Sequence, residues 1–484
     1  MSIMEGLLVA LLVATAVACV LARTPRSWRQ KLMIGTGVLL SCSLVAGVAI
    51  SRIMFPMFEA PPPSGAHGVG IADLHFVDPA REETMTDDRD DRRELMVRVW
   101  YPARVPEGAE PEPFLREVEP LHHILTRGMP YLPVLMLDHL LRIPSHSYLD
   151  APLAEAQGRF PVLIFSHGNS FYAGQNALLM EHLASHGYAV FSIEHPYQAA
   201  WVKFPDGRIA KYRNNWNVEG TIDQERLRQE EETFYRALYA GDYEEYRASL
   251  TELIEGNPGA NTGVGLWLDD TTLLLDELAR TGGAAPGGHG SMSVADRQAA
   301  MERFAGRLDL ERVGVFGMSY GGAVAGEFCS QDARCKAGLN MDGLQYGAAG
   351  TSLQIPRPFM FLYADQRGLA ATRNEGVDAS TPTPFHMNDF AWRQVQGVAY
   401  SLTIAGAAHM SFSDFALTAA MLRKAGMLGS IDPEVMRELL NDTVLAFFNQ
   451  TLQGTREPLL DGALVKRRGV LEFEARDGRA TAVE

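Results

Sequence analysis

The stretch Val313-Gly-Val-Phe-Gly317-Met-Ser319-Tyr-Gly321-Gly322 is the part of the sequence that decides the fold. Its first four residues predict a buried strand, and the small residues after Gly322 predict the start of a helix. A Gly-x-Ser-x-Gly turn between a strand and a helix is typical of a nucleophile elbow, which exposes a serine hydroxyl at the edge of a sheet. A glycine-rich loop is the alternative, but it does not explain the strand before the turn. Ser319 is therefore the predicted nucleophile.

Further apolar runs predict the sheet around this turn. Short, continuously apolar segments indicate parallel strands buried on both faces. They are residues 161–165, 188–193, 313–316 and 358–363, with 401–404 predicted as the last strand. Residues 71–76 and 95–101 alternate as strands on either side of an acidic hairpin tip. The alternation of these strands with helices predicts an α/β fold with a mostly parallel sheet, whose ligand site lies at the carboxyl ends of the strands.

The N-terminal residues differ in composition from the rest of the chain. Residues 6–22 and 32–50 form two apolar runs, each long enough to cross a hydrocarbon core of about 30 Å. Residues 23–31 lie between them and carry cations but no anion, which favours a cytoplasmic loop. We therefore expect a transmembrane hairpin over residues 1–53 and an extracytoplasmic location for everything that follows. A cleaved signal peptide fits less well, because residues 1–5 have no positive charge.

The remaining chain divides by composition into three parts. Residues 54–70 include a run of prolines and predict a stiff linker. Residues 71–454 form the predicted α/β domain, with a helical insertion at about 205–305 that departs from the strand–helix rhythm. Within the insertion, residues 225–253 are a charged stretch that predicts helical structure. Residues 455–484 are a polar tail and predict an extension at the edge of the domain.

Charge and cysteine content exclude several classes of function. The formal net charge of −16, without any block of Lys or Arg, argues against a nucleic-acid partner. The sequence has no Cys/His cluster with metal-binding spacing, so we expect neither a metal nor another cofactor. Cys329 and Cys335 are six residues apart, and both a local disulfide and two free thiols are open.

A serine nucleophile requires a base and an orienting carboxylate. In this type of fold they follow in the order Ser, Asp or Glu, then His. His409 comes directly after a predicted strand, whereas His386 has no strand before it, so His409 is the predicted base. Asp342 and Asp365 each follow a predicted strand, and the residues alone do not choose between them.

The oxyanion of the reaction requires two backbone N–H donors. The residue after the nucleophile, Tyr320, is the first predicted donor. Asn169 is the second, because it follows Phe165-Ser-His-Gly168 at the end of a buried strand, and the glycine there lets the backbone turn its N–H groups inward. The alternative is a simple strand-ending turn with a packed His167.

Several segments between residues 95 and 452 resemble the platelet-activating-factor acetylhydrolase family of plasma and type II enzymes, the group VII phospholipases A2. These segments are Phe165-Ser-His-Gly168, Leu183-Ala-Ser-His-Gly-Tyr188 with Glu194-His195, Arg228-Gln-Glu-Glu-Glu-Thr233 and His409-Met-Ser-Phe-Ser-Asp-Phe415. The family's elbow usually reads Gly-His-Ser-Phe-Gly-Gly, so Met318 and Tyr320 depart from it.

The resemblance implies an α/β-hydrolase fold and calcium-independent hydrolysis of short or oxidised sn-2 acyl chains of glycerophospholipids. In the family the acid lies about two dozen residues after the serine. Here the separation is 342 − 319 = 23, which favours Asp342 over Asp365. The expected partners are a phospholipid or small ester and the lipid bilayer, and the oligomeric state is open. A broader carboxylesterase or polyester hydrolase of the cutinase or dienelactone-hydrolase type is one alternative, and a catalytically silent membrane-tethered binding protein is another.

Overall fold

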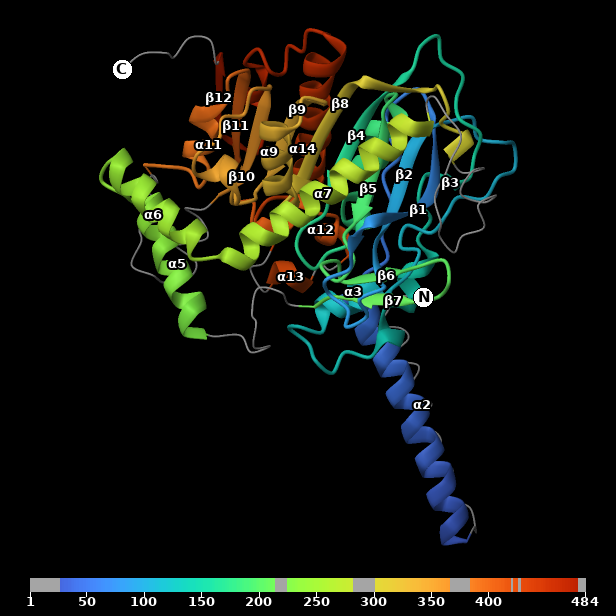
Figure 1. The fold of residues 1–484 in the computed structure, drawn as a ribbon. Helices are drawn as coiled ribbons and strands as arrows, with labels where there is room; N and C mark the ends of the chain where they lie inside the picture. Colours follow the sequence, from blue (N-terminus) through green and yellow to red (C-terminus); the bar gives the residue numbers. More distant parts are fainter. Residues whose placement is uncertain are drawn as a thin grey trace.

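A ten-stranded sheet forms the centre of the computed structural model, which describes residues 27–213, 224–281, 301–365, 384–418, 421–424 and 428–477. The strand order is β12-β11-β10-β9-β8-β4-β5-β2-β1-β3 (Figure 1). The strands are β1 (Gly68–Glu82), β2 (Arg92–Ala103), β3 (Ser147–Leu149), β4 (Phe160–Ser166), β5 (Ala189–Glu194), β8 (Leu308–Met318), β9 (Cys335–Met341), β10 (Phe359–Ala364), β11 (Val398–Ile404) and β12 (Val470–Asp477).

The middle of this sheet is parallel. Strands β5, β4, β8, β9, β10 and β11 pair side by side in the same direction. Antiparallel pairs lie only toward the edges among the described strands of this sheet, where β2 joins β1 and β5, and β12 joins β11. The predicted mostly parallel sheet and the antiparallel β1–β2 hairpin are thereby confirmed. Residues 401–404 lie in β11, the last of the parallel strands, and the polar tail, predicted as an edge extension, adds the antiparallel strand β12 beyond it.

Helices cover both faces of the sheet because the central strands are apolar on both sides. Leu163 and Phe165 of β4 pack in the core cluster that includes α4 (Ala177–Ser185) and α14 (Pro433–Phe448). Val162 and Ile164 of the same strand pack on the other face, with α7 (Pro258–Thr281) and α9 (Tyr320–Gln331). All seven residues of β4 are buried, as the continuously apolar run predicted.

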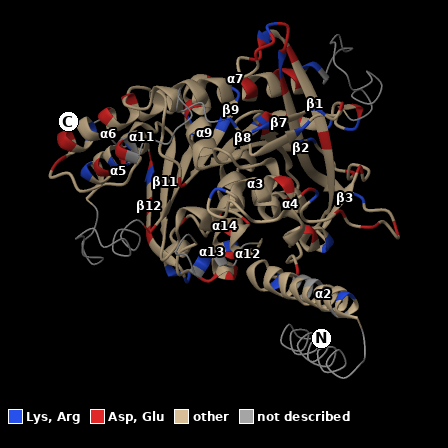
Figure 2. Ribbon diagram, turned by 90° about the horizontal axis from the view of Figure 1, so that it is seen from below, with Lys and Arg blue, Asp and Glu red and all other residues tan. Residues whose placement is uncertain are grey.

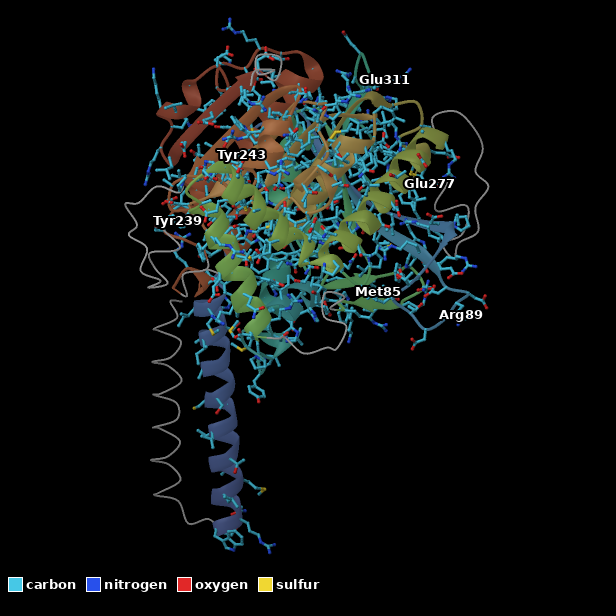
Figure 3. The ribbon with its side chains drawn as sticks, turned by 60° about the vertical axis from the view of Figure 1, so that its left-hand side comes forward. Met85, Arg89, Tyr239, Tyr243, Glu277 and Glu311 are labelled. Atoms are coloured by element: carbon cyan, nitrogen blue, oxygen red, sulfur yellow. A yellow bond between two sulfur atoms is a disulfide. The ribbon has the colours of Figure 1, made fainter. Side chains whose placement is uncertain are left out.

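A small hairpin begins just before the insertion, and the described part of the insertion contains three helices, α5 (Gln224–Leu238), α6 (Tyr243–Glu255) and α7. Strands β6 (Trp201–Lys203) and β7 (Ile209–Lys211) form this hairpin, while α5 and α6 project from the sheet (Figure 1). Tyr239 and Tyr243 mark the turn between these two helices (Figure 3). The charged helical stretch expected over 225–253 is thus two helices with a break between them. Asp242 starts a second helix by accepting hydrogen bonds from the N–H groups of Glu244 and Glu245, both 2.9 Å away.

Helix α2 (Trp28–Met54) extends away from the domain and contains the predicted second span, 32–50 (Figure 1). The predicted first span, 6–22, lies outside the described residues. Most of α2 is drawn tan in Figure 2, and large apolar side chains are exposed along it. They are Trp28, Leu32, Met33, Leu39, Ile50 and Ile53. A search of the described part of the chain finds no helix that combines the length and the apolar character needed to cross a membrane. The transmembrane hairpin stays a prediction.

The remaining described helices are short. Helix α3 (Glu119–Leu125) contacts β6. Two 3₁₀ turns follow it, η1 (Val134–Met136), which packs against α2, and η2 (Asp138–Arg142). His139 Nε2 lies 2.7 Å from the Phe55 carbonyl oxygen just after α2. Three further short helices lie in the C-terminal part of the chain. Helix α11 (Asp389–Gln394) comes between β10 and β11, and α12 (Phe415–Thr418) and α13 (Met421–Lys424) come between β11 and α14.

Candidate active site

The turn between β8 and α9 has the geometry of a nucleophile elbow. Ser319 has φ 56° and ψ −122°, a conformation that non-glycine residues rarely adopt and that is found mainly at functional sites. Its N–H donates to the Met341 carbonyl oxygen at 2.7 Å, which fixes the turn against β9. A β carbon on Gly321 would fall 2.0 Å from the Ser166 carbonyl oxygen, so only glycine allows β4 to approach this closely.

Ser319, His409 and Asp342 form a continuous hydrogen-bonded line. Ser319 Oγ lies 2.9 Å from His409 Nε2, and His409 Nδ1 lies 2.7 Å from Asp342 Oδ2. The His409 side chain is 45% exposed, whereas that of Asp342 is 1% exposed. The serine and imidazole thus open to the surface while the carboxylate is shielded beneath them.

The two candidate carboxylates have different contacts. Asp342 follows β9 with φ 54°, and its Oδ1 accepts the Ala364 N–H at 2.7 Å. This second bond leaves Oδ2 directed at His409. Asp365 follows β10, and its Oδ2 accepts the Gly406 N–H at 3.0 Å. This hydrogen bond holds Asp365 against the loop that leads to His409.

His386, the alternative base, is far from this line of residues. Its ring stacks on Tyr363 with centroids 4.7 Å apart, and its Nε2 lies 3.6 Å from a carboxylate oxygen of Glu472. The structure brings His409, and not His386, to Ser319.

The loop after β4 lies directly against the elbow. A β carbon on Gly168 would contact Ser319 Cβ at 3.4 Å and the Met318 sulfur at 3.3 Å. The next residue, Asn169, has a backbone N–H for which the described residues provide no acceptor. Its side-chain Nδ2 donates to the Tyr212 hydroxyl at 3.1 Å. Tyr320 begins α9 on the other side of the serine, so the two predicted donors lie in the two segments that adjoin Ser319.

Residues 53–241 and 285–459 match the family described as Platelet-activating factor acetylhydrolase, isoform II. The chain belongs to this family.

Curated relatives of this acetylhydrolase-family protein are distant in sequence. A platelet-activating factor acetylhydrolase of Cavia porcellus is 24% identical over 315 residues, covering 63% of this chain and 60% of the relative. A Gallus gallus protein of the same name is 24% identical, with coverage of 62% and 64%. The chain therefore spans less than two thirds of these relatives. A probable 1-alkyl-2-acetylglycerophosphocholine esterase of Arthroderma benhamiae is 24% identical, covering 87% of this chain and 95% of the relative.

A solved structure of a ferulic acid esterase from Streptomyces cinnamoneus has the same fold. It aligns with a TM-score of 0.58 and 24% identity, covering 83% of this chain and 95% of the esterase chain. Together with the mostly parallel sheet and the elbow, this similarity identifies an α/β-hydrolase fold.

Two residues of the elbow depart from the family pattern. Met318 is completely buried beneath the turn, beside Gly168. The Tyr320 hydroxyl donates to the Ala260 carbonyl oxygen, and the Tyr320 ring meets the Trp267 ring edge-on with centroids 4.9 Å apart. Tyr320 thereby joins the elbow to α7, a helix of the insertion.

Cys329 and Cys335 form a disulfide, which resolves a question that the sequence left open. The bond connects the last turns of α9 to the start of β9, the strand that leads to Asp342. A search of the described residues for groups of His, Cys, Asp and Glu suited to a metal ion finds none.

The family-like segment 228–233 lies on α5, in the insertion. Arg228 is exposed and forms ion pairs with Glu225 and Glu232 on the same helix. Asp270 of α7 was not predicted, although it lies in a buried cluster next to the loop that follows β4. The one available signal was a pair of aspartates in the middle of an otherwise apolar helical segment.

Proposed function

We propose that this protein is a serine esterase that hydrolyses short or oxidised sn-2 acyl esters of glycerophospholipids. The observation that carries the proposal is the hydrogen-bonded line from Ser319 through His409 to Asp342, in a member of the platelet-activating factor acetylhydrolase family. A neutral serine is a weak nucleophile, and this arrangement is the one that activates it.

In the proposed mechanism Ser319 Oγ attacks the ester carbonyl carbon while its proton passes to His409 Nε2. Asp342 accepts the Nδ1–H of the same ring, holds the reactive tautomer and stabilises the imidazolium. The N–H groups of Asn169 and Tyr320 bind the oxyanion of the tetrahedral intermediate. His409 then returns the proton to the departing alcohol oxygen, which leaves an acyl-enzyme. A water molecule attacks the acyl carbon with His409 as base, and this second step releases the acid and restores Ser319.

The phospholipid substrate class is supported by family membership and by the names of the relatives. The A. benhamiae protein, which aligns over nearly its whole length, is named as a probable 1-alkyl-2-acetylglycerophosphocholine esterase. A broader carboxylesterase is the second candidate. The exposure of the His409 side chain, 45%, favours it, because an open site accepts esters of varied shape.

We further propose that the N-terminal segment attaches the enzyme to a membrane with the α/β domain outside the cytoplasm. The exposed apolar side chains along α2 and the cationic residues 23–31 support attachment. The Cys329–Cys335 disulfide supports an oxidising compartment. Protease treatment of intact cells tests this location, since a protected domain in intact cells and a digested domain in lysed cells would contradict it.

Labelling with a fluorophosphonate and a substrate panel together test the activity. The parent protein should label, and a Ser319→Ala variant should neither label nor hydrolyse esters. A protein that does not label, or a Ser319→Ala variant that labels equally, would remove the enzymatic proposal. The panel compares 2-acetyl with long-chain 2-acyl phosphatidylcholine and p-nitrophenyl esters of the same chain lengths. Preference for the 2-acetyl phospholipid supports the first candidate, and turnover of p-nitrophenyl esters alone supports the second.

A further inference from the structure

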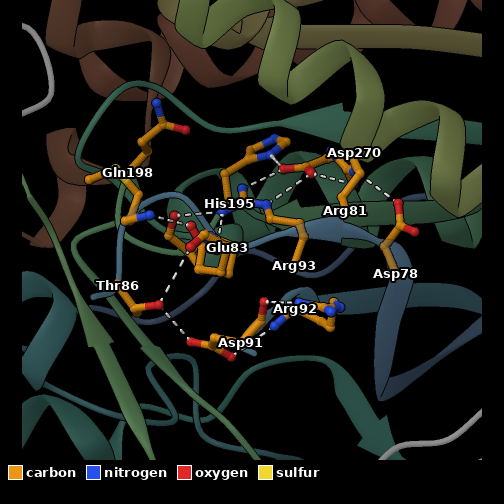
Figure 4. A network of polar contacts seen from close by, with 12 residues as sticks. Asp78, Arg81, Glu83, Thr86, Asp91, Arg92, Arg93, His195, Gln198 and Asp270 are labelled. Carbon is orange, nitrogen blue, oxygen red and sulfur yellow. Dashed lines mark hydrogen bonds and ion pairs between the residues drawn. The ribbon is translucent and has the colours of Figure 1, made fainter. Parts of the chain in front are cut away.

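A cluster of buried polar side chains lies directly behind the loop that carries Asn169. We call it the Asp270 cluster, and it consists of Asp270 on α7, Arg93 on β2, His195 after β5 and Ser166 at the end of β4 (Figure 4 shows the first three). All four residues are at most 1% exposed. Buried ionised groups are costly unless they are paired, so the contacts within the cluster decide what it does.

The Asp270 carboxylate is saturated by cationic and N–H donors. Its Oδ2 lies 2.6 Å from an Arg93 guanidinium nitrogen and 2.8 Å from His195 Nδ1. Its Oδ1 accepts from Arg93 Nε at 3.1 Å and from Arg81 at 2.9 Å (Figure 4). Burial by itself would raise the pKa of Asp270, but the Arg93 guanidinium and the His195 ring hold that pKa well below its usual range. Asp270 is therefore ionised, and His195 Nδ1 carries the hydrogen that faces it.

The fixed tautomer of His195 determines its next contact. Since Nδ1 holds the hydrogen, Nε2 has the lone pair and accepts from the Ser166 hydroxyl, 3.2 Å away. Burial lowers the pKa of His195 to about 4, although the Asp270 carboxylate opposes this shift. The order Ser166–His195–Asp270 resembles that of the candidate active site. All three residues are buried, however, so no substrate reaches Ser166 and the cluster is not a second active site.

His167 connects this cluster to the oxyanion loop. The backbone N–H of His195 donates to His167 Nε2 at 3.3 Å. The hydrogen of the neutral His167 ring is therefore on Nδ1, which lies 2.7 Å from the Gly168 carbonyl oxygen and donates to it. Burial and the neighbouring His195 lower the pKa of His167 to about 3, which keeps the ring neutral.

Two hydrogen bonds to the Gly168 carbonyl oxygen, one of them from His167, fix the direction of the next N–H. The described chain has no cis peptide bond, and in a planar trans peptide the C=O and N–H groups point in opposite directions. The Gly168 carbonyl oxygen accepts from His167 Nδ1 and also from the Phe171 N–H at 3.0 Å, so the Asn169 N–H points away from both donors. Gly168 itself lies against Ser319, so the Gly168–Asn169 peptide is beside the serine.

A second contact from α7 holds the far side of the same loop. Trp267 lies one helical turn before Asp270 and stacks on the His195 ring, with centroids 3.8 Å apart and an interplanar angle of 8°. Its indole N–H donates to the Gln198 side chain. The Gln198 carbonyl oxygen in turn accepts the Ser170 N–H at 2.7 Å, where Ser170 has a φ of 64°. One face of α7 thus supports the loop at both ends.

We propose that Asp270 is a positioning residue which acts through His195 and His167 to hold the Gly168–Asn169 peptide with its N–H toward Ser319. The inference rests on the proposed function, because it assigns the Asn169 N–H to the oxyanion. Asp270 and His167 touch neither substrate nor reacting atoms.

The test compares two variants of His167 with the parent protein. Leu in a His167→Leu variant has similar size but no N–H, whereas Asn in a His167→Asn variant places an N–H near the position of Nδ1. We expect kcat for a p-nitrophenyl ester to fall about 100-fold in the Leu variant, the effect of losing one oxyanion donor, with KM within threefold of the parent. The Asn variant should recover kcat to within about tenfold. Affinity for a trifluoromethyl ketone, which forms an oxyanion on Ser319, should fall in parallel with kcat.

Two further variants complete the design. Asp270→Asn should lower kcat in the same way. Its thermal unfolding is measured alongside, because Arg93 loses one of its two carboxylate partners and keeps Glu83. His182→Leu makes the same chemical change at a buried histidine on α4, and it should leave kcat unchanged. Equal kcat in the parent, His167→Leu and, where it folds, Asp270→Asn would overturn the inference. If the parent protein hydrolyses esters and these variants have the same kcat, the inference about Asp270 is refuted and the proposed function stands. If the parent protein does not label with fluorophosphonate, the proposed function itself is refuted.

Discussion

Asp342 and His409 meet at 2.7 Å although 67 residues of chain separate them. The contact forms because β9 and β11 are both parallel to β10, which lies between them, so their carboxyl ends reach the same edge of the sheet. Asp365, at the end of β10, bonds instead to the Gly406 N–H. We therefore expect replacement of Asp342 and replacement of Asp365 to have different effects on activity.

Replacement of Asp342 by Asn should lower kcat by about 10⁴-fold, because an amide that donates toward Nδ1 selects the wrong imidazole tautomer. Replacement of Asp365 by Asn should lower kcat less than about tenfold, since the Asp365 N–H still holds the Ala407 carbonyl oxygen at 2.9 Å. Steady-state kinetics on one ester, with circular dichroism to check folding, measure both effects. A larger loss from Asp365→Asn than from Asp342→Asn would reverse the proposed roles.

Gly321 should not tolerate a side chain. Its β carbon would overlap the Ser166 carbonyl oxygen at 2.0 Å, so Gly321→Ala must push β4 and the elbow apart. We expect a loss of unfolding free energy of about 1–3 kcal/mol and the loss of fluorophosphonate labelling. Gly265→Ala is the matched control, because nothing lies within 4 Å of its β carbon on α7, and Ala favours a helix by about 1 kcal/mol. Urea denaturation compares the two, and equal stability would contradict the elbow geometry.

Glu181 should make stability fall with increasing pH. It is 1% exposed, and its Oε1 accepts from Ser147 Oγ at 2.6 Å, while its Oε2 is buried without a partner among the described residues. Burial raises the pKa of Glu181, against the hydrogen bonds from Ser147 and His146. The folded state therefore retains a proton that the unfolded chain releases near pH 4.3. Stability is unaffected below that pH and declines as pH rises from there to the folded pKa.

A Glu181→Gln variant removes this titration, so its unfolding free energy should decline less with pH than that of the parent protein. Urea denaturation at several pH values between 4 and 8 measures the two slopes. Glu302→Gln, at an exposed position, is the control and should follow the parent. Parallel curves for the parent and Glu181→Gln would show that Glu181 is not the source of the slope.

The Cys329–Cys335 disulfide should stabilise the connection between α9 and β9, the two elements that carry Tyr320 and lead to Asp342. The two cysteines are six positions apart in the sequence. In the chain-entropy model, closing so short a loop stabilises the folded state by about 2 kcal/mol. Reduction, or a Cys335→Ser variant, should therefore lower the thermal midpoint. A double Cys329→Ser, Cys335→Ser variant that no longer responds to reductant is the control. An unchanged midpoint on reduction of the parent would contradict a structural role for this bond.

Local patterns in the sequence were sufficient for the parts that depend on neighbouring residues. Glycines at 317 and 321 around Ser319 predicted the elbow, and continuously apolar runs predicted strands such as β4 and β5, because backbone conformation and burial follow from short stretches. The sequence also predicted His409 from its place after a strand. The break between α5 and α6 was missed, although Asp242 is a recognisable helix cap.

The tertiary structure alone decided which distant side chains meet. Strand order and register brought Asp342, rather than Asp365, to His409, and α7 brought Asp270 to His195 across 75 residues. Sequence spacing carries no information about such contacts. They depend on which strands are neighbours and on which face of a helix is buried, and both are properties of the packed chain.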